Sequence, residues 1–332
     1  MQAYIDLAIK RAWRYQGLTF PNPAVGACVI GAKGEILGLN AHQKAGEAHG
    51  EVLALRDAYV LLTGDDSIAL TCKAHEIHEY LLKNHNNIFH TCSIYVTLEP
   101  CSHIGKTPSC ASLISALGFK KVIIGQSDTN PCASGGKAIL ESKNIIIEKA
   151  MQEKKSYDLL YPFLSWQKNS FVTFKWAQRL DGTIDGGTLS SQASHEYVHA
   201  MRNVCDLLVI GGNTVREDRP TLDARMVDGR APDILIYSHE DTFDREIALF
   251  KIDNRKVYIE NSLDKMKDYK NILIEGGSGM FEATKEVVDY YLTFISPKSG
   301  GGTMSLLKNS DEFEILHVSP IESDIMLWMK RK

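Results

Sequence analysis

Short apolar runs rich in β-branched residues alternate with helix-like stretches along almost the whole chain of 332 residues. Strands that alternate with amphipathic helices favour an α/β layer structure in which helices cover a largely parallel sheet. In the first half, strands are predicted at Ala24–Ile30, Ser93–Leu98, Lys121–Gly125 and Ile145–Glu148, and helices at Asp6–Gln16, Gly50–Leu62 and Ser109–Leu117. The first half is therefore expected to be a three-layer α/β domain.

The alternation restarts after a segment that is charged at its beginning and aromatic at its end. We expect this segment, residues 150–167, to form a connecting helix between a first domain of residues 1–149 and a second of residues 168–332. A chain of this length also favours two domains, at roughly 100–200 residues each. Strands of the second α/β domain are predicted at Phe171–Ala177, Leu207–Gly211, Asp233–Tyr237, Lys256–Glu260, Asn271–Glu275 and Tyr290–Ile295.

Charge and hydropathy narrow the class of partner. The formal net charge of −4 argues against a broad electrostatic surface for nucleic acid or an anionic membrane. The sequence begins without a signal-peptide pattern and contains no apolar run of about 18 residues. We expect a cytoplasmic protein that acts on a small molecule, binds neither nucleic acid nor membrane, and forms a homo-oligomer. The seven cysteines are odd in number and irregularly spaced, which favours reduced thiols and a metal site over disulfides.

A histidine-rich stretch, residues 63–92, suggests a metal site at first sight. It contains Cys72, His75, His78, His85 and His90. Their offsets match no common zinc pattern, because a Cys-x2-His-x2-His run on one regular helix does not place three ligands tetrahedrally. We expect this stretch to be a solvated helical insertion that lies outside the active site.

A histidine and a glutamate two residues apart, His49 and Glu51, open a predicted helix, and Pro100-Cys101 and then Cys110 follow a predicted strand. This arrangement marks zinc-dependent nucleobase deaminases. One imidazole and two thiolates leave the fourth tetrahedral position of a zinc ion for water, whose pKa the metal lowers to about 7. The pattern therefore predicts one zinc ion per chain, held by His49, Cys101 and Cys110, with Glu51 moving the protons.

Two other functions fit the same residues. One is a deaminase of tRNA or of free nucleosides with an appended non-catalytic domain, although a tRNA enzyme would be expected to carry a basic face. The other is a binding protein with a structural zinc ion, although structural sites usually have four protein ligands.

The spacing of the cysteines points to a particular family. Eight residues separate Cys101 from Cys110, whereas most nucleoside and nucleobase deaminases have two. This spacing resembles that in the deaminase half of the RibD family of bifunctional riboflavin biosynthesis enzymes. The segments 97–103, 21–26 and 128–131 resemble the same half. Gly50 stands where that family usually has alanine, and residues 63–92 are longer than expected. Asn22, in a Pro-Asn-Pro segment, is a candidate contact to the ring or ribose of the substrate, and a turn role is its alternative.

The second half resembles the reductase half of the same family, a dihydrofolate-reductase-like α/β domain that uses NADPH. The resemblance is carried by segments 175–182, 211–225 and 275–279, each of which follows a predicted strand. The last of these is a strand, a glycine-rich turn and a helix, where a phosphate could bind. The resemblance implies cofactor contacts at Ala177, Thr214, Asp218, Ser238 and Gly277 and substrate contacts at Arg202, Leu222, Arg225 and Glu275. Lys175 or Glu275 would assist proton transfer.

Two departures from the family concern this half. Arg179 replaces the serine that usually precedes Leu-Asp-Gly, and the loop of residues 183–191 is short and lacks the expected serine and tryptophan. The sequence also shows no clear reader of the 2′-phosphate of NADPH.

The resemblance implies two consecutive reactions. A cytidine-deaminase-like domain would remove an amino group from 2,5-diamino-6-ribosylamino-4(3H)-pyrimidinone 5′-phosphate, using Zn²⁺. A dihydrofolate-reductase-like domain would then reduce the ribosyl group to ribityl with NADPH.

Overall fold

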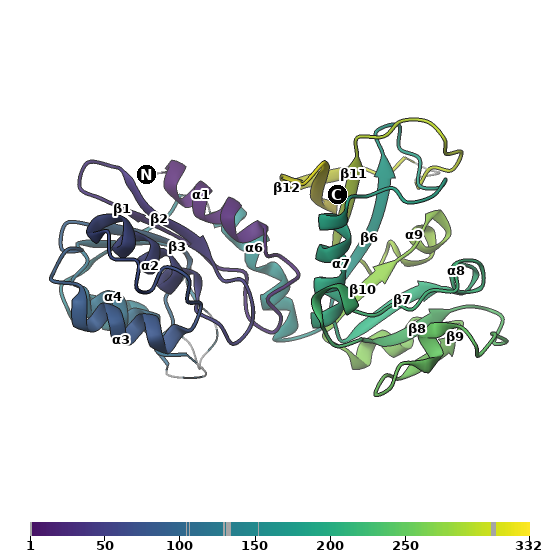
Figure 1. Ribbon diagram of the computed structural model, residues 1–332, viewed down its shortest axis with the longest axis horizontal. Helices are drawn as coiled ribbons and strands as arrows, with labels where there is room; N and C mark the ends of the chain where they lie inside the picture. Colours follow the sequence, from purple (N-terminus) through teal and green to yellow (C-terminus); the bar gives the residue numbers. More distant parts are fainter. Residues whose placement is uncertain are drawn as a thin grey trace. The chain divides into compact units, whose positions relative to one another are not determined.

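The computed structural model describes residues 2–103, 105, 107–128, 130, 134–151, 153–306 and 310–332. Thr129 and Pro131 of the segment 128–131 and Cys132, one of the seven cysteines, lie outside the described residues. The chain divides into two compact units, Met1–Phe163 and Leu164–Lys332, and the division falls inside helix α6 (Glu153–Trp166) (Figure 1). None of the helices in the described part is both long and apolar enough to cross a membrane.

The first unit is built on a mixed five-stranded sheet with the order β2-β1-β3-β4-β5. Its strands are β1 (Gly26–Ile30), β2 (Ile36–Ala41), β3 (Ser93–Leu98), β4 (Lys121–Gln126) and β5 (Ile146–Lys149). Strands β3, β4 and β5 are parallel, but β1 is antiparallel to both β2 and β3. The expectation of a largely parallel sheet is wrong at this edge. The sequence analysis missed β2, and the short turn between β1 and β2 permits only antiparallel pairing.

Helices cover both faces of this sheet. They are α1 (Gln2–Trp13), α2 (Gly50–Thr63), α3 (Ala74–Asn84), α4 (Cys110–Ala116) and α5 (Gly136–Glu141), together with α6. A Cβ atom on Gly26 of β1 would lie 2.0 Å from the carbonyl oxygen of Ala8 in α1, and one on Gly38 of β2 would lie 2.1 Å from that of Ala54 in α2. Glycine at these two positions therefore lets one helix approach each face of the sheet closely.

The stretch of residues 63–92 is packed more deeply than predicted. Helix α3 places Ile77, His78 and Leu81 in the interior, and Phe89 after the helix is also buried. Apolar residues at helical spacing form one face of α3, and this face joins the core beneath α2 and α4. The expectation of a solvated insertion is therefore wrong for one face of the helix. His75 on the other face is exposed.

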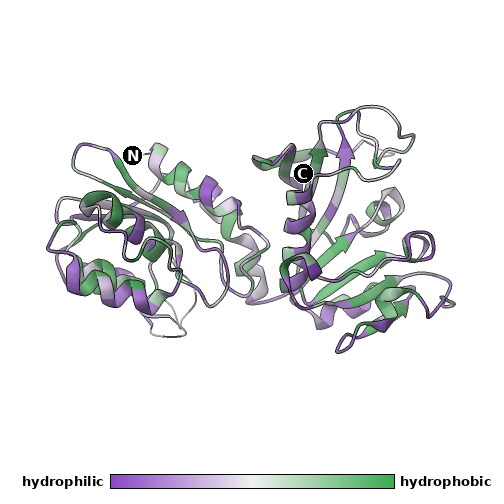
Figure 2. Cartoon of the chain, viewed as in Figure 1, coloured by the Kyte–Doolittle hydropathy of each residue, from purple (hydrophilic) through white to green (hydrophobic). Residues whose placement is uncertain are grey.

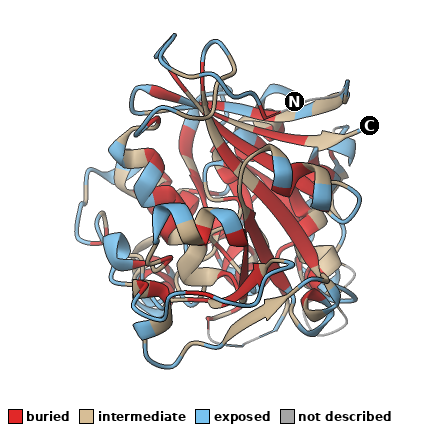
Figure 3. Cartoon of the chain, turned by 90° about the vertical axis from the view of Figure 1, so that its right-hand side faces the viewer, coloured by how far each residue is buried: buried red, intermediate tan, exposed pale blue. Residues whose placement is uncertain are grey.

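The second unit holds an eight-stranded sheet with the order β12-β13-β11-β6-β10-β7-β8-β9. Its strands are β6 (Phe171–Arg179), β7 (Leu207–Gly211), β8 (Asp233–Tyr237), β9 (Val257–Glu260), β10 (Asn271–Glu275), β11 (Tyr290–Ser296), β12 (Phe313–Ile321) and β13 (Asp324–Arg331). The neighbours from β11 to β9 are parallel, whereas β12 and β13, which the sequence analysis missed, form an antiparallel hairpin at one edge. The strands are largely hydrophobic and buried (Figures 2 and 3).

Helices α7 (Gln192–Val204), α8 (Gly212–Asp218) and α9 (Ser278–Thr284) connect the parallel strands of this sheet. Because β6, β10, β7 and β8 are neighbours and parallel, their carboxyl ends lie along one edge. In open α/β sheets this edge is where ligands bind.

The packing of α3 can be tested with adjacent leucines. Leu81 is fully buried, so Leu81→Ala should lower the free energy of unfolding of the first unit by about 2–5 kcal/mol, because it leaves a cavity. Leu82 is 47% exposed, and Leu82→Ala should change it by less than about 0.5 kcal/mol. Hydrogen exchange of the β3 and β4 amides in the full chain, measured against urea concentration, reports on this unit alone. Equal effects of the two substitutions would mean that α3 lies on the surface.

Candidate metal centre and a second polar site

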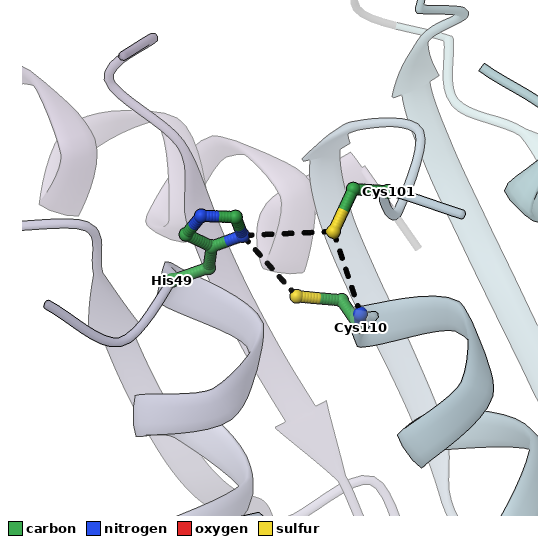
Figure 4. Close-up of side chains that lie close together, drawn as sticks. All are labelled: His49, Cys101 and Cys110. Atoms are coloured by element: carbon green, nitrogen blue, oxygen red, sulfur yellow. Dashed lines mark hydrogen bonds between the residues drawn. The ribbon is translucent and has the colours of Figure 1, made fainter. Parts of the chain in front are cut away.

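Three predicted ligands from distant parts of the chain converge in the first unit. His49 is the residue before α2, Cys101 follows β3, and Cys110 begins α4. The Nδ1 atom of His49 lies 3.7 Å from Sγ of Cys101 and 3.4 Å from Sγ of Cys110 (Figure 4). Among the described residues, these three form the one group of His, Cys, Asp or Glu side chains whose ligand atoms lie close enough together to share a metal ion. The histidines of residues 63–92 do not belong to it.

Local hydrogen bonds hold the two cysteines in place. Ser109 caps α4, because its Oγ atom accepts the backbone N–H of Ser112 at 3.1 Å. The same hydroxyl donates to the carbonyl oxygen of Cys101 at 2.9 Å, and the backbone N–H of Cys110 donates to Sγ of Cys101 at 3.4 Å. The start of α4 thus positions both sulfur atoms.

The imidazole of His49 is oriented from its other side. Its Nε2 atom lies 3.4 Å from the hydroxyl oxygen of Thr107, and its ring meets the ring of His42 edge-on, with 5.3 Å between the centroids. Nδ1 is therefore the nitrogen that faces the two sulfur atoms, and Nε2 can donate to Thr107. Hydrogen bonds of this kind usually orient histidine ligands of metal ions.

The two thiols share a proton in the absence of a metal ion. A hydrogen bond from the Cys110 thiol lowers the pKa of Cys101, while the same hydrogen bond and burial raise the pKa of Cys110. Glu51 is only 3% exposed, and burial raises its pKa to about 7. Its Oε2 atom is buried and has no hydrogen-bond partner among the described residues. One imidazole, two thiols and an unsatisfied carboxylate beside them fit a zinc ion with one open position.

A cavity of about 350 Å³ is lined in part by His49 and Cys101, and its volume is within the size range of small-molecule sites. Its polar lining includes Asn22, His42, Glu51, Asp128 and Asn130. The sequence analysis assigned no role to His42 or Asp128. His42 precedes His49 by seven residues in a loop, where no periodic pattern could have revealed it.

His42 determines which way the amide of Asn22 points. Burial lowers the pKa of His42 to about 4, so the ring is neutral near pH 7. Its Nδ1 atom lies 3.1 Å from the carbonyl oxygen of Ala48 and must donate to it, because a carbonyl can only accept. Nε2 then accepts from the amide nitrogen of Asn22 at 3.1 Å. The amide oxygen of Asn22, a residue that lines the cavity, is left as a hydrogen-bond acceptor.

The second unit gathers the other predicted site residues at the carboxyl edge of its sheet. Ala177 lies near the end of β6, Thr214 and Asp218 lie on α8 directly after β7, Ser238 follows β8, and Gly277 follows β10. These five predicted cofactor contacts are spread over about 100 residues of sequence. Parallel strand order alone brings them to neighbouring positions.

A buried charged group lies at the same edge. Lys175 and Glu275 are register partners on β6 and β10, and Arg202 of α7 donates to both carboxylate oxygens of Glu275, at 2.7 and 2.9 Å. Burial opposes ionisation of Glu275, but Arg202 and Lys175 together lower its pKa to about 2. Burial lowers the pKa of Lys175.

The two arginines expected to contact the substrate already have protein partners. Arg202 is paired with Glu275, and Nη1 of Arg225 lies 3.0 and 3.1 Å from the carboxylate oxygens of Asp223. Leu222 is buried with a left-handed backbone, φ 54°, and its carbonyl oxygen accepts from Arg255. Arg225 is largely exposed and could exchange partners, whereas Arg202 is held by two hydrogen bonds in the interior.

Arg179, which departs from the family pattern, supports the short loop that follows it. The side chain is buried and donates to the hydroxyl of Thr183 at 3.4 Å and to the carbonyl oxygens of Asp185 and Gly186. Ile184 in this loop would lie 3.3 Å from a Cβ atom on Gly277. The loop therefore reaches the predicted cofactor turn although it lacks the expected serine and tryptophan.

Comparison with known proteins matches each half of the chain to a described family. The cytidine and deoxycytidylate deaminase zinc-binding region matches residues 1–126, and the RibD C-terminal domain matches residues 170–327. The chain is 30% identical to a riboflavin biosynthesis protein RibD of Corynebacterium ammoniagenes, over 90% of this chain and 87% of that protein. It is 28% identical to a RibD of Aquifex aeolicus, over 99% and 98% of the two chains.

A solved structure supports the same fold. A diaminohydroxyphosphoribosylaminopyrimidine deaminase/5-amino-6-(5-phosphoribosylamino)uracil reductase from Thermotoga maritima superposes with a TM-score of 0.65. The match has 25% sequence identity and covers 100% of this chain and 98% of that one.

The metal centre predicts the zinc content of variants. The unmodified chain should hold one zinc ion, and a Cys101→Ser, Cys110→Ser double variant should hold almost none, because both thiolates are lost. As a control, a His75→Ala, His78→Ala double variant should keep about one ion, since neither imidazole belongs to the group of ligand atoms that could share the metal ion. Elemental analysis of the purified, folded proteins measures this. A clear loss of zinc in the histidine variant would reveal a site in residues 63–92.

Proposed function

Because the chain belongs to the RibD family of riboflavin biosynthesis proteins, we propose that its two units catalyse two consecutive reactions on one pyrimidine ribotide. The first unit hydrolyses an amino group of 2,5-diamino-6-ribosylamino-4(3H)-pyrimidinone 5′-phosphate, and the second reduces the ribosyl group of the product to ribityl with NADPH. The observation that carries the first assignment is the convergence of His49, Cys101 and Cys110 beside the buried carboxylate of Glu51.

In the deaminase reaction, His49, Cys101 and Cys110 would hold the zinc ion, which would supply a water nucleophile with a pKa lowered to about 7. Glu51 would accept a proton from the attacking water and deliver protons to the ring nitrogen and to the leaving ammonia. A carboxyl group with a pKa near 7 can both accept and donate a proton at neutral pH, which is what this role needs. The carbon that loses its amino group gains the oxygen of water.

The cavity beside the metal centre would bind the pyrimidine ring. The amide oxygen of Asn22 would accept a hydrogen bond from an N–H or hydroxyl group of the substrate, because His42 occupies its amide nitrogen. Asp128, whose pKa burial raises, lies in the same lining. A site lined with acceptors favours a substrate that carries several amino groups.

In the reductase reaction, NADPH supplies the hydride. Lys175, in the middle of β6, is the register partner of Glu275 at the carboxyl end of β10, and together they would hold the opened sugar and move a proton to it. Arg202 keeps Glu275 ionised. The cofactor would lie across the neighbouring strand ends and contact Ala177, Thr214, Asp218, Ser238 and the turn at Gly277. Leu222 and Arg225 would contact the substrate, with Arg225 exchanging Asp223 for the phosphate.

The alternative of a nucleoside or tRNA deaminase with an appended non-catalytic domain is not favoured. The match of residues 170–327 to the RibD C-terminal domain gives the second unit a catalytic family of its own. The homo-oligomer, the cytoplasmic location and the lack of a nucleic-acid partner stay predictions.

The two activities should be separable by one substitution. Glu51→Gln keeps the size of the side chain but removes the proton carrier, so deamination should fall by about 10²–10⁴-fold or more while zinc stays bound. The variant should still oxidise NADPH at close to the unmodified rate when it is given the deaminated ribosylamino-pyrimidinedione phosphate. Ammonia release and NADPH absorbance measure the two steps separately.

The control for this experiment is Glu47→Gln, the same change at a residue of the loop before His49 that does not line the cavity. It should leave both rates unchanged. If Glu51→Gln abolished NADPH oxidation on the deaminated substrate in a folded, zinc-loaded protein, the two reactions would share a site and the assignment to two units would fall.

Arg225 should act only when the substrate carries a phosphate. Arg225→Ala should raise the KM for the phosphorylated substrate of the reductase about tenfold, and much less for a dephosphorylated analogue, because the lost guanidinium has no phosphate to bind in the analogue. Steady-state kinetics of NADPH oxidation with both compounds tests this. An equal rise for both compounds would indicate that Arg225 supports the fold through Asp223 instead.

A further inference from the structure

Arg216 lies at the edge of the sheet where the cofactor is proposed to bind, but it is not one of the proposed cofactor or substrate contacts. It belongs to α8 after β7, and its Nη2 atom lies 3.3 Å from Oγ of Ser238, the residue after β8. Strands β7 and β8 are adjacent and parallel, so 22 residues of sequence separate two groups that meet in space. Thr214 and Asp218, on the same helix, are two of the proposed cofactor contacts.

The guanidinium of Arg216 is held in place by an aromatic ring. Its Cζ atom lies 4.3 Å from the centroid of the Phe243 ring, at the distance of a cation–π contact. The side chain is 28% exposed, so the stack covers one part of the guanidinium and leaves another open to solvent. A guanidinium ordered in this way loses little conformational entropy when it binds an anion.

The backbone leaves room beside this group. A Cβ atom on Gly212 would lie 2.5 Å from Oγ of Ser238 and 3.1 Å from Nη1 of Arg216. Glycine at the β7–α8 turn therefore keeps free a small space between a hydroxyl group and a guanidinium. These two groups together suit a phosphate monoester, to which arginine donates two hydrogen bonds and serine a third.

One acidic residue competes for the same arginine. Oε2 of Glu240 lies 3.2 Å from Nη2 of Arg216, and the backbone carbonyl oxygen of Glu240 lies 3.3 Å from it. The Glu240 carboxylate is 76% exposed, so the ion pair is weak and its carboxylate can turn into solvent at little cost. An incoming dianion can take its place.

We propose that Arg216, with Ser238, binds the 2′-phosphate of NADPH and so makes the reductase unit select NADPH over NADH. In dinucleotide-binding α/β sheets, the group after a neighbouring strand distinguishes the two cofactors, and an arginine there accommodates the 2′-phosphate. The proposal rests on the proposed reductase function, since it needs the cofactor to lie across the ends of β7 and β8. It adds the specificity-determining residue that the sequence did not show.

The test is direct binding of dinucleotides to the full chain, measured by calorimetry with NADP⁺ and NAD⁺. The unmodified chain should bind NADP⁺ more tightly than NAD⁺. Arg216→Met keeps the stem on Phe243 but loses the charge, so the Kd for NADP⁺ should rise at least about tenfold, or 1.4 kcal/mol. The Kd for NAD⁺ should change by less than about twofold, because NAD⁺ has no 2′-phosphate for Arg216 to bind.

Two further variants sharpen the result. Arg245 also stacks on a phenylalanine, Phe250, at 4.6 Å, but no contact joins it to Ser238, so Arg245→Met is a matched control that should leave both Kd values unchanged. Glu240→Gln removes the competing carboxylate and should tighten NADP⁺ binding without affecting NAD⁺. The two substitutions at the site are thus expected to act in opposite directions.

The outcomes separate the inference from the function on which it rests. If the unmodified chain bound neither dinucleotide, the proposed reductase function would fail. If it bound both but preferred NAD⁺, or if Arg216→Met weakened both equally, the reductase function would stand and the role of Arg216 would be refuted. If Arg216→Met did not fold, Arg216→Gln would decide, because it also removes the charge and unchanged NADP⁺ binding in that variant would refute the role.

Discussion

Parallel pairing of neighbouring strands is the constraint on which both sites depend. In the first unit, β3 and β4 are parallel neighbours, and their carboxyl ends lead to Cys101 and to Asp128 on the lining of one cavity. In the second unit, β6, β10, β7 and β8 do the same for the proposed cofactor and substrate contacts. Side chains that follow different strands meet because the hydrogen bonds of a parallel sheet bring all its carboxyl ends to one edge.

Burial raises the pKa of two glutamates, but their neighbours differ, so their pKa values end on opposite sides of the usual one. Glu51 is buried next to the metal ligands without a hydrogen-bond partner for one oxygen, and burial raises its pKa to about 7. Glu275 is buried as well, but Arg202 and Lys175 lower its pKa to about 2. A carboxyl group near neutrality can carry protons, and a permanently ionised one can orient a cation or a sugar hydroxyl. The same residue type thus serves two chemistries.

Several groups in the interior position others without touching a reacting atom. His42 orients Asn22, Ser109 positions both cysteines, and Arg179 holds the loop that reaches Gly277. Each makes hydrogen bonds whose direction is determined by a backbone carbonyl, which can only accept. The polar groups that line the two sites are therefore ordered before any ligand binds, which lowers the entropy cost of binding.

The sequence by itself determined the α/β class and the family of each half, and it named a set of metal ligands that stays a prediction. Strands such as Ser93–Leu98 and Asn271–Glu275 coincide with β3 and β10, because continuous apolar β-branched runs are a strong local signal. His49, Cys101 and Cys110 were recognisable because their spacing is short and chemically specific. Strand β2 was missed because it contains glycine and asparagine, which are depleted in strands, and β12 and β13 were missed because they are partly exposed.

Only the tertiary structure decided which polar residues share a site. Several contacts join residues from separate elements. Arg202 pairs with Glu275, His42 accepts a hydrogen bond from Asn22, and Arg216 lies close to Ser238. One face of α3 is buried against other elements in the same way. No local pattern encodes such contacts, because they depend on strand order and register, which arise from packing along the whole chain. A sequence motif identifies the chemistry that a residue can perform, and the fold determines which partners that residue meets.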